Sequence, residues 1–147
     1  MTEWDYWTSE EALRWGYRKL SHVTDRPRRE AELLLLNHVD VPRATLLAHP
    51  ERTLTSDQVA GFVRDVRRRA SGEPLPYVRG WIEFFALDFN VTSDVLIPRP
   101  ETEQLVALGC DWLDVHPGGR VIDVGTGSGC IAVALATARP DLHLGAS

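Results

Sequence analysis

The sequence predicts a small α-helical bundle, followed by a β-hairpin linker and then by the start of an α/β domain. Three observations lead to this fold class. Residues 1–70 show helical periodicity throughout. The stretch "GEPLPYVRG" (72–80) then interrupts the helical pattern with two prolines and two glycines. Residues 120–139 have the order of a short apolar strand, a glycine-rich loop and a small apolar helix.

These patterns predict three segments. The bundle is expected over residues 1–73, the linker and hairpin over 74–98, and the incomplete α/β domain over 99–147. Within the second segment, the stretch 72–80 is rich in proline and glycine. It is expected to be the most exposed linker and the boundary between the domains.

Composition indicates an ordinary globular protein. The chain has 147 residues, of which 44% are hydrophobic and 25% charged. No apolar run approaches the ~20 residues that a membrane span requires, so no membrane association is expected. The N-terminus is acidic and aromatic, unlike a secretory signal, and a cytoplasmic location is therefore expected.

The charge and the potential metal ligands of the chain argue against nucleic-acid binding and against a metal site. The net charge is −5, and residues 74–147 carry the acidic excess, so direct nucleic-acid binding is not expected. The run Arg67-Arg68-Arg69 is interpreted as the solvated end of a helix rather than a nucleic-acid patch. Cys110 and Cys130 lack metal-type spacing, and the five histidines are scattered, so no metal site is expected.

The bundle helices can be delimited from their ends. Thr8 or Ser9 is expected to cap the first helix, and Pro27 to open the second. Thr55 and Gln58 have the spacing of a capping box, and Gly72 is placed to end the same helix. The expected buried stripes are Leu13, Tyr17 and Leu20 in the first helix, and Val59, Phe62, Val63 and Val66 in the last.

Polar and aromatic residues of the bundle are read as structural. His38 shares a face with Ala31, Leu34 and Leu35, and it is interpreted as a core residue with a satisfied side chain. Trp4, Trp7 and Trp15 are expected to pack against the bundle.

Residues 81–91 alternate as a β-hairpin does, with apolar positions at Ile82, Phe84, Leu87, Phe89 and Val91. A helix is then expected from Thr102, or from the Pro100-Glu101 pair. Its apolar positions are Leu105, Val106, Leu108 and Leu113.

The strand, loop and helix near the end of the chain are the candidate ligand site. Val121, Ile122 and Val124 predict a short buried strand, and residues 130–138 predict a helix packed on the sheet. Between them the glycines run G-x-G-x-G rather than in the dinucleotide pattern G-x-G-x-x-G, and no Lys-Ser/Thr pair follows. Asp123 would repel a pyrophosphate, but it suits a ligand that carries an ammonium and a sulfonium.

The residues "DVGTGSG" (123–129) resemble motif I of the Rossmann-like methyltransferases that use S-adenosyl-L-methionine. The longer stretch "GEPLPYVRGWIEFFALDFNVTSDVLIPRPETEQLV" (72–106) is more specific. It resembles the corresponding segment of the bacterial peptide chain release factor N5-glutamine methyltransferases. That family also begins with a small helical bundle, which contacts the release factor.

The resemblance implies the chemistry. The cofactor would be S-adenosyl-L-methionine, and its binding residues here would be Asp123, Gly125, Thr126, Gly127, Ser128 and Gly129. The family transfers a methyl group to the side-chain amide nitrogen of the glutamine in the GGQ motif of peptide chain release factors. That nitrogen is a poor nucleophile, and the family holds it in position with an NPPY motif.

Part of this machinery is not found in the chain. No NPPY motif occurs, so no catalytic residue is assigned, and the family's ribose-binding acid would fall one residue after Ser147. The chain is therefore expected to be the front part of such an enzyme and inactive alone. Two other interpretations stay open. One is a non-catalytic remnant that binds a partner. The other is a methyltransferase for a ribosomal-protein glutamine or for adenine N6 of a nucleic acid.

Overall fold

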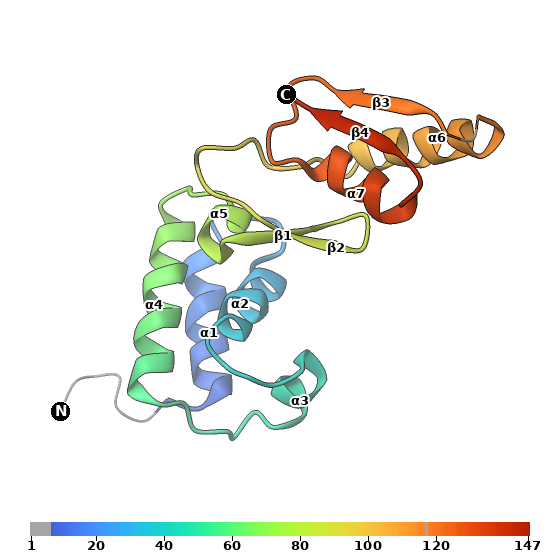
Figure 1. Cartoon of the computed structure of the whole chain (residues 1–147). Helices are drawn as coiled ribbons and strands as arrows, with labels where there is room; N and C mark the ends of the chain where they lie inside the picture. The colour runs from blue at the N-terminus through green and yellow to red at the C-terminus, as the bar shows by residue number, and fades with distance from the viewer. Residues whose placement is uncertain (1–6, 117) are drawn as a thin grey trace. The chain divides into compact units, whose positions relative to one another are not determined.

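The computed structural model describes residues 7–116 and 118–147. The chain divides after Arg79 into two compact units, the second of which covers Gly80–Ser147. Within the described residues, the first unit is built from helices and the second combines strands with helices, as Figure 1 shows. This is the coarse order that the sequence predicts.

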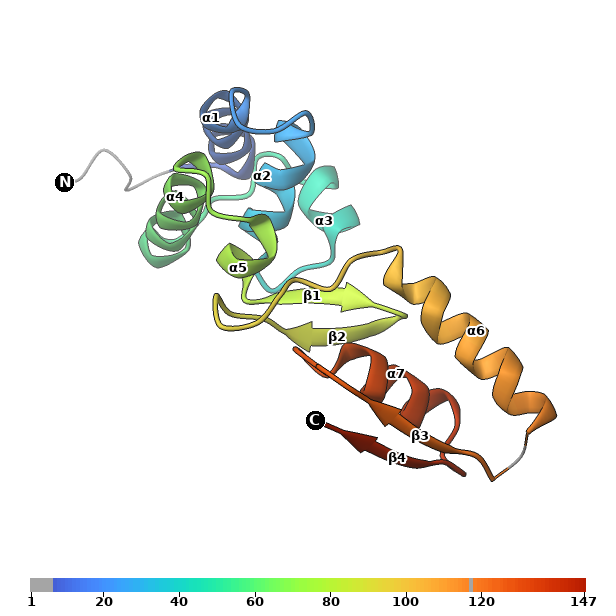
Figure 2. The same cartoon turned by 90° about the horizontal axis from the view of Figure 1, so that it is seen from above.

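The first unit is a helical bundle. Figure 2 shows its helices in a view turned by 90° from that of Figure 1. The helix α1 packs against both α2 and α4, and α2 and α4 also contact each other. The bounds are α1 Ser9–Leu20, α2 Pro27–Leu36, α3 Arg43–Ala48, α4 Ser56–Ala70 and α5 Leu75–Arg79.

The helix ends are those that the sequence predicts. Thr8 caps α1 in a capping box with Glu11, and Thr55 caps α4 in a capping box with Gln58. Pro27 is the first residue of α2. Gly72 follows the end of α4 with a φ of +100°, a conformation that favours glycine.

The buried face of α1 differs from the expected stripe. Its buried residues are Ser9, Ala12, Gly16 and Leu20, whereas Tyr17 is 48% exposed. The helices approach closely at Gly16, where a Cβ would lie 2.8 Å from the ring of Phe62. This close approach turns the small side chains of α1 inward and leaves Tyr17 on the surface. In α4, by contrast, the predicted stripe of Val59, Phe62, Val63 and Val66 is buried.

Aromatic rings and one polar pair complete the core of the bundle. The ring of Trp15 lies 5.6 Å from that of Trp7 and 6.2 Å from that of Phe62, as measured between centroids. Trp4 lies outside the described residues. His38 Nε2 is 2.7 Å from Asp65 Oδ2, so the interpretation of His38 as a core residue with a satisfied side chain is confirmed.

The expectation of an exposed linker over residues 72–80 is wrong for its second half. Leu75–Arg79 forms the helix α5, and Val78 is buried in the core of the bundle. The division between the units therefore lies after Arg79, whereas the sequence places the end of the bundle at residue 73. Prolines 74 and 76 are compatible with this helix because proline is tolerated in a first turn, where its missing N–H is not required.

The second unit begins with the predicted hairpin, whose strands are antiparallel, and it continues with a parallel pair, β3 and β4. The core lies where Phe84 and Phe89 of the hairpin meet α6 and α7. The hairpin is thus part of this unit and not of a linker. The bounds are β1 Trp81–Phe84, β2 Leu87–Asn90, α6 Thr102–Val115, β3 Arg120–Asp123, α7 Cys130–Ala138 and β4 His143–Ala146.

The β3–β4 sheet is less buried than the sequence predicts. Ile122 is 74% exposed, and Val124, which lies just beyond the end of β3, is 80% exposed. In α6, Val106 and Leu113 are buried, whereas Leu105 and Leu108 lie on the surface. Parallel strands are normally covered on both faces, and within the described residues one face of this sheet is open. Among those residues, no helix is both long enough and apolar enough to cross a membrane.

Candidate functional site

The candidate site is the loop that joins β3 to α7. Asp123 is the last residue of β3, and Gly129 directly precedes α7, which begins at Cys130. The strand β4 continues the sheet beside β3 with parallel register, pairing Asp123 with Ala146. The loop therefore lies at the carboxyl end of two parallel strands and at the N-terminus of a helix, where α/β folds bind their ligands.

The loop needs glycine at alternate positions. Gly125, Gly127 and Gly129 have φ values of +75°, +56° and +77°. No heavy atom lies within 4 Å of a Cβ built on Gly125, and only the carbonyl oxygen of Gly125 reaches that distance from one built on Gly127. The space on this side of the loop is therefore open, and a ligand can approach the backbone closely.

Hydrogen bonds fix part of the loop and leave two donors. The backbone N–H groups of Gly125 and Thr126 both donate to the main-chain oxygen of Ser147, at 2.9 and 3.1 Å. The N–H of Gly129 closes a turn on the carbonyl of Thr126. Among the described residues, no acceptor receives the N–H groups of Gly127 and Ser128.

Asp123 supplies the negative charge of the site. The hydroxyl of Thr126 donates to Asp123 Oδ2 at 2.9 Å, and this bond holds the half-buried carboxylate against the loop. Its second oxygen, Oδ1, has no protein partner within the described residues. The Asp123–Thr126 contact is the feature of the site that sequence reasoning missed, although an Asp and a Thr three residues apart around a tight turn could have indicated it.

The arrangement offers both signs of partial charge to one ligand. The two available N–H groups and the positive end of the α7 dipole suit an electron-rich group, whereas the Asp123 carboxylate suits a cation. The six residues predicted to bind the cofactor lie together at the end of β3 and in the loop that follows it: Asp123, Gly125, Thr126, Gly127, Ser128 and Gly129. No cluster of three or more potential metal ligands occurs among the residues that the structure describes.

Comparisons with known proteins show which families the chain resembles. The model of the PrmC N-terminal domain matches residues 11–80. A release factor glutamine methyltransferase of Koribacter versatilis is 45% identical over 121 residues, which are 82% of this chain and 43% of the relative. The one from Coxiella burnetii is 46% identical over 123 residues, or 84% of this chain and 44% of the relative.

The chain resembles the N-terminal part of the release factor glutamine methyltransferases.

Two further matches are also to methyltransferases. The model of protein-L-isoaspartate(D-aspartate) O-methyltransferase matches residues 49–139, which include β3, the glycine loop and α7. A Vibrio cholerae release factor glutamine methyltransferase is 38% identical over 134 residues, or 90% of this chain and 46% of the relative. The chain thus spans less than half the length of these family members.

Proposed function

We propose that this chain supplies the methyl-donor site of an enzyme that methylates the glutamine of the GGQ motif in peptide chain release factors. The observation that carries the proposal is the loop from Asp123 to Gly129. In this loop three glycines with positive φ open the backbone to a ligand beside a carboxylate held by Thr126. The names of the relatives support the choice of acceptor.

The residues of the loop fit S-adenosyl-L-methionine, which supplies a methyl group on a positively charged sulfur. Asp123 would attract the cationic part of the ligand, and the N–H groups of Gly127 and Ser128 would bind its oxygen atoms. Gly125 and Gly127 would admit the ligand, because a side chain at either position would project into the open space. The fold would then be the start of a Rossmann-like methyltransferase domain.

The protein acceptor would require two contacts. The helical bundle, which contains the residues matched by the PrmC N-terminal domain, would bind the release factor away from its glutamine. The resemblance implies that the amide nitrogen of the glutamine would be held by an NPPY motif, which does not occur in this chain. The chain alone would then be inactive, and the site of action would be the cytoplasm, where translation terminates.

A chimera tests the proposal. Residues 1–147 would be joined to the remaining C-terminal part of the Koribacter versatilis relative and incubated with labelled S-adenosyl-L-methionine. The acceptors would be a bacterial release factor, the same factor with its GGQ glutamine replaced by alanine, a ribosomal fraction, DNA and an isoaspartyl peptide. We expect label only on the intact release factor.

Each other outcome would decide against the proposal. Label on the ribosomal fraction or on DNA would select one of the alternative methyltransferases. Label on the isoaspartyl peptide would favour the second matched family model. A chimera that binds the donor but labels no acceptor would support a remnant that only binds a partner.

A further inference from the structure

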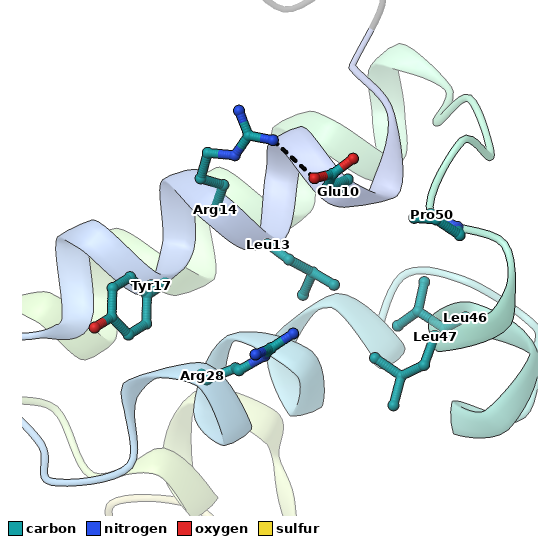
Figure 3. A pocket seen from close by; sticks show the side chains of 8 residues that line it. All are labelled: Glu10, Leu13, Arg14, Tyr17, Arg28, Leu46, Leu47 and Pro50. Atoms are coloured by element: carbon teal, nitrogen blue, oxygen red, sulfur yellow. Dashed lines mark hydrogen bonds and ion pairs between the residues drawn. The ribbon is translucent and has the colours of Figure 1, made fainter.

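The helical bundle has a groove between α1, α2 and α3 with a volume of about 420 Å³. Figure 3 shows Leu13 of α1 and Leu46 of α3 directed toward the same space, while Arg28 reaches it from α2. Tyr17 and Leu47 also line the groove, and their side chains are 48% and 39% exposed. The groove therefore offers an apolar floor that an apolar side chain of a partner can cover.

Positive charge gathers around Glu32, which pairs with Arg28 of the groove. Glu32 of α2 is buried, and the guanidinium groups of three arginines lie within 4.0 Å of its carboxylate. Arg43 binds it closely, at 2.6 and 2.9 Å, whereas Arg28 and Arg29 stand at 3.9 and 3.8 Å. One carboxylate cannot neutralise three guanidinium groups, so a positive excess remains around Glu32, and Arg28 carries part of it into the groove.

Arg28 is the group best placed to use this charge. Its side chain is 85% exposed, and its only ion pair among the described residues is the 3.9 Å contact with Glu32. The other arginine of the groove, Arg14, already donates to Glu10 at 2.8 Å. Arg28 therefore keeps most of its donors for a partner, and a guanidinium pairs well with a carboxylate.

We propose that this groove docks an acidic, amphipathic segment of the protein substrate. An apolar side chain of that segment would lie against Leu13, Tyr17 and Leu47, and a neighbouring carboxylate would pair with Arg28. This inference rests on the proposed function in taking the substrate to be a release factor. It adds which surface of the bundle holds that substrate and by what chemistry.

The apolar floor together with the charge of Arg28 favours a polypeptide segment over a nucleic acid or a second copy of this chain. A nucleic-acid backbone carries a phosphate at each step and would not use an apolar floor made of leucines and a tyrosine. A second copy of this groove would bring its own excess of arginines against the first, and like charges oppose such pairing.

The test measures binding of an unmodified bacterial release factor to the 147-residue chain by calorimetry. Arg28→Glu should weaken binding by about tenfold or more, since it puts a like charge opposite the partner's carboxylate. Leu47→Glu should weaken binding similarly by placing a charge on the apolar floor. Arg67→Glu is the matched control, because Arg67 is an exposed arginine of α4 that does not line this groove. It should leave the dissociation constant within about twofold.

The outcomes separate this inference from the proposed function. If the release factor binds and Arg28→Glu has no more effect than Arg67→Glu, the groove is not the docking surface, whatever the chimera methylates. If the chain binds no release factor while the chimera methylates it, the docking inference fails and the proposed function stands. Binding of a single-stranded RNA that Arg28→Glu abolishes, without release factor binding, would assign the surface to nucleic acid. Circular dichroism of each variant shows that its helices are intact.

Discussion

Arg69 Nε donates to Glu30 Oε2 at 2.7 Å, and each of the two side chains is only 14% exposed. This pair joins the end of α4 to the first turn of α2. The preceding Arg68 forms a second pair with Glu73, at 2.8 Å from its Nε. Two of the three consecutive arginines thus hold the bundle together, and they do not form a free basic patch.

Arg69→Met should destabilise the first unit by about 2–3 kcal/mol, because it leaves the Glu30 carboxylate in a poorly solvated place without its cation. Arg67→Met removes the same charge from an exposed position two residues earlier, and the change should stay within about 0.5 kcal/mol. Urea unfolding followed by circular dichroism measures both. Equal effects of the two variants would mean that the Arg69–Glu30 pair contributes nothing.

Gly61→Ala should destabilise α4, although alanine favours a helix by about 1 kcal/mol. A Cβ at this position would lie 2.5 Å from Nδ1 of His38, so the ring must move away from the buried Asp65 carboxylate. Losing that partner costs about 1–3 kcal/mol and outweighs the helix propensity.

Amide hydrogen exchange checks this prediction, and Gly109→Ala in α6 is its control. There a Cβ would meet only the flexible end of Leu135, at 3.2 Å. Exchange in α4 should become faster with Gly61→Ala, whereas exchange in α6 should stay the same or slow with Gly109→Ala. Slower exchange in α4 would show that His38 can move without loss.

Sequence reasoning succeeded where a local signal decides the structure. Thr55 with Gln58, Pro27 and Gly72 each act on the adjacent backbone, so their roles can be read from their spacing. Residues 123–129 are one continuous segment, from the end of β3 through the loop, and the candidate site could therefore be located without knowing the rest of the fold.

Sequence reasoning failed where contacts between segments that are distant in the sequence decide which side chains are buried. The burial of Gly16 depends on Phe62, which lies in another helix, and hydrophobicity alone assigned that face to Tyr17. The turn at Phe85 and Ala86 has positive φ at both residues, a conformation that favours glycine or asparagine. The turn is supported by Glu103 of α6, whose carboxylate accepts a hydrogen bond from the backbone N–H of Phe85 at 3.0 Å. No local sequence pattern predicts this bond.

Acid should weaken the link between α4 and the start of α5. The hydrogen bond from Arg68 lowers the pKa of Glu73 below its usual value. Because this pKa is lower in the folded chain than in the unfolded one, Glu73 stabilises the fold above its usual pKa. That contribution is lost as the pH falls through the lower, folded value. In a carboxyl NMR titration, Arg68→Met should raise the midpoint of Glu73. An unchanged midpoint would show that Arg68 does not control this carboxylate.

The 147-residue chain by itself should bind S-adenosyl-L-methionine no more tightly than about millimolar. Its loop offers Asp123 and the N–H groups of Gly127 and Ser128, but Val124 and Gly125 beside them are exposed. Lacking even one charge-assisted hydrogen bond, worth about 1.5–3 kcal/mol, weakens binding by roughly ten- to a hundredfold. Calorimetry that gave a micromolar dissociation constant would mean that the described loop is sufficient.

We propose that the segment from Asp123 to Gly129 holds the methyl donor, and calorimetry of S-adenosyl-L-methionine with the chimera measures this binding. Gly127→Val should abolish binding, because its side chain would project into the open space and a branched residue is strained at a φ of +56°. Gly145→Val in β4 is the matched control, since its φ is not positive and no atom lies within 4 Å of its Cβ. We expect the Gly145→Val chimera to bind S-adenosyl-L-methionine like the unmodified chimera and the Gly127→Val chimera not to bind it. Equal binding by the two variants would show that the glycine loop does not hold the methyl donor.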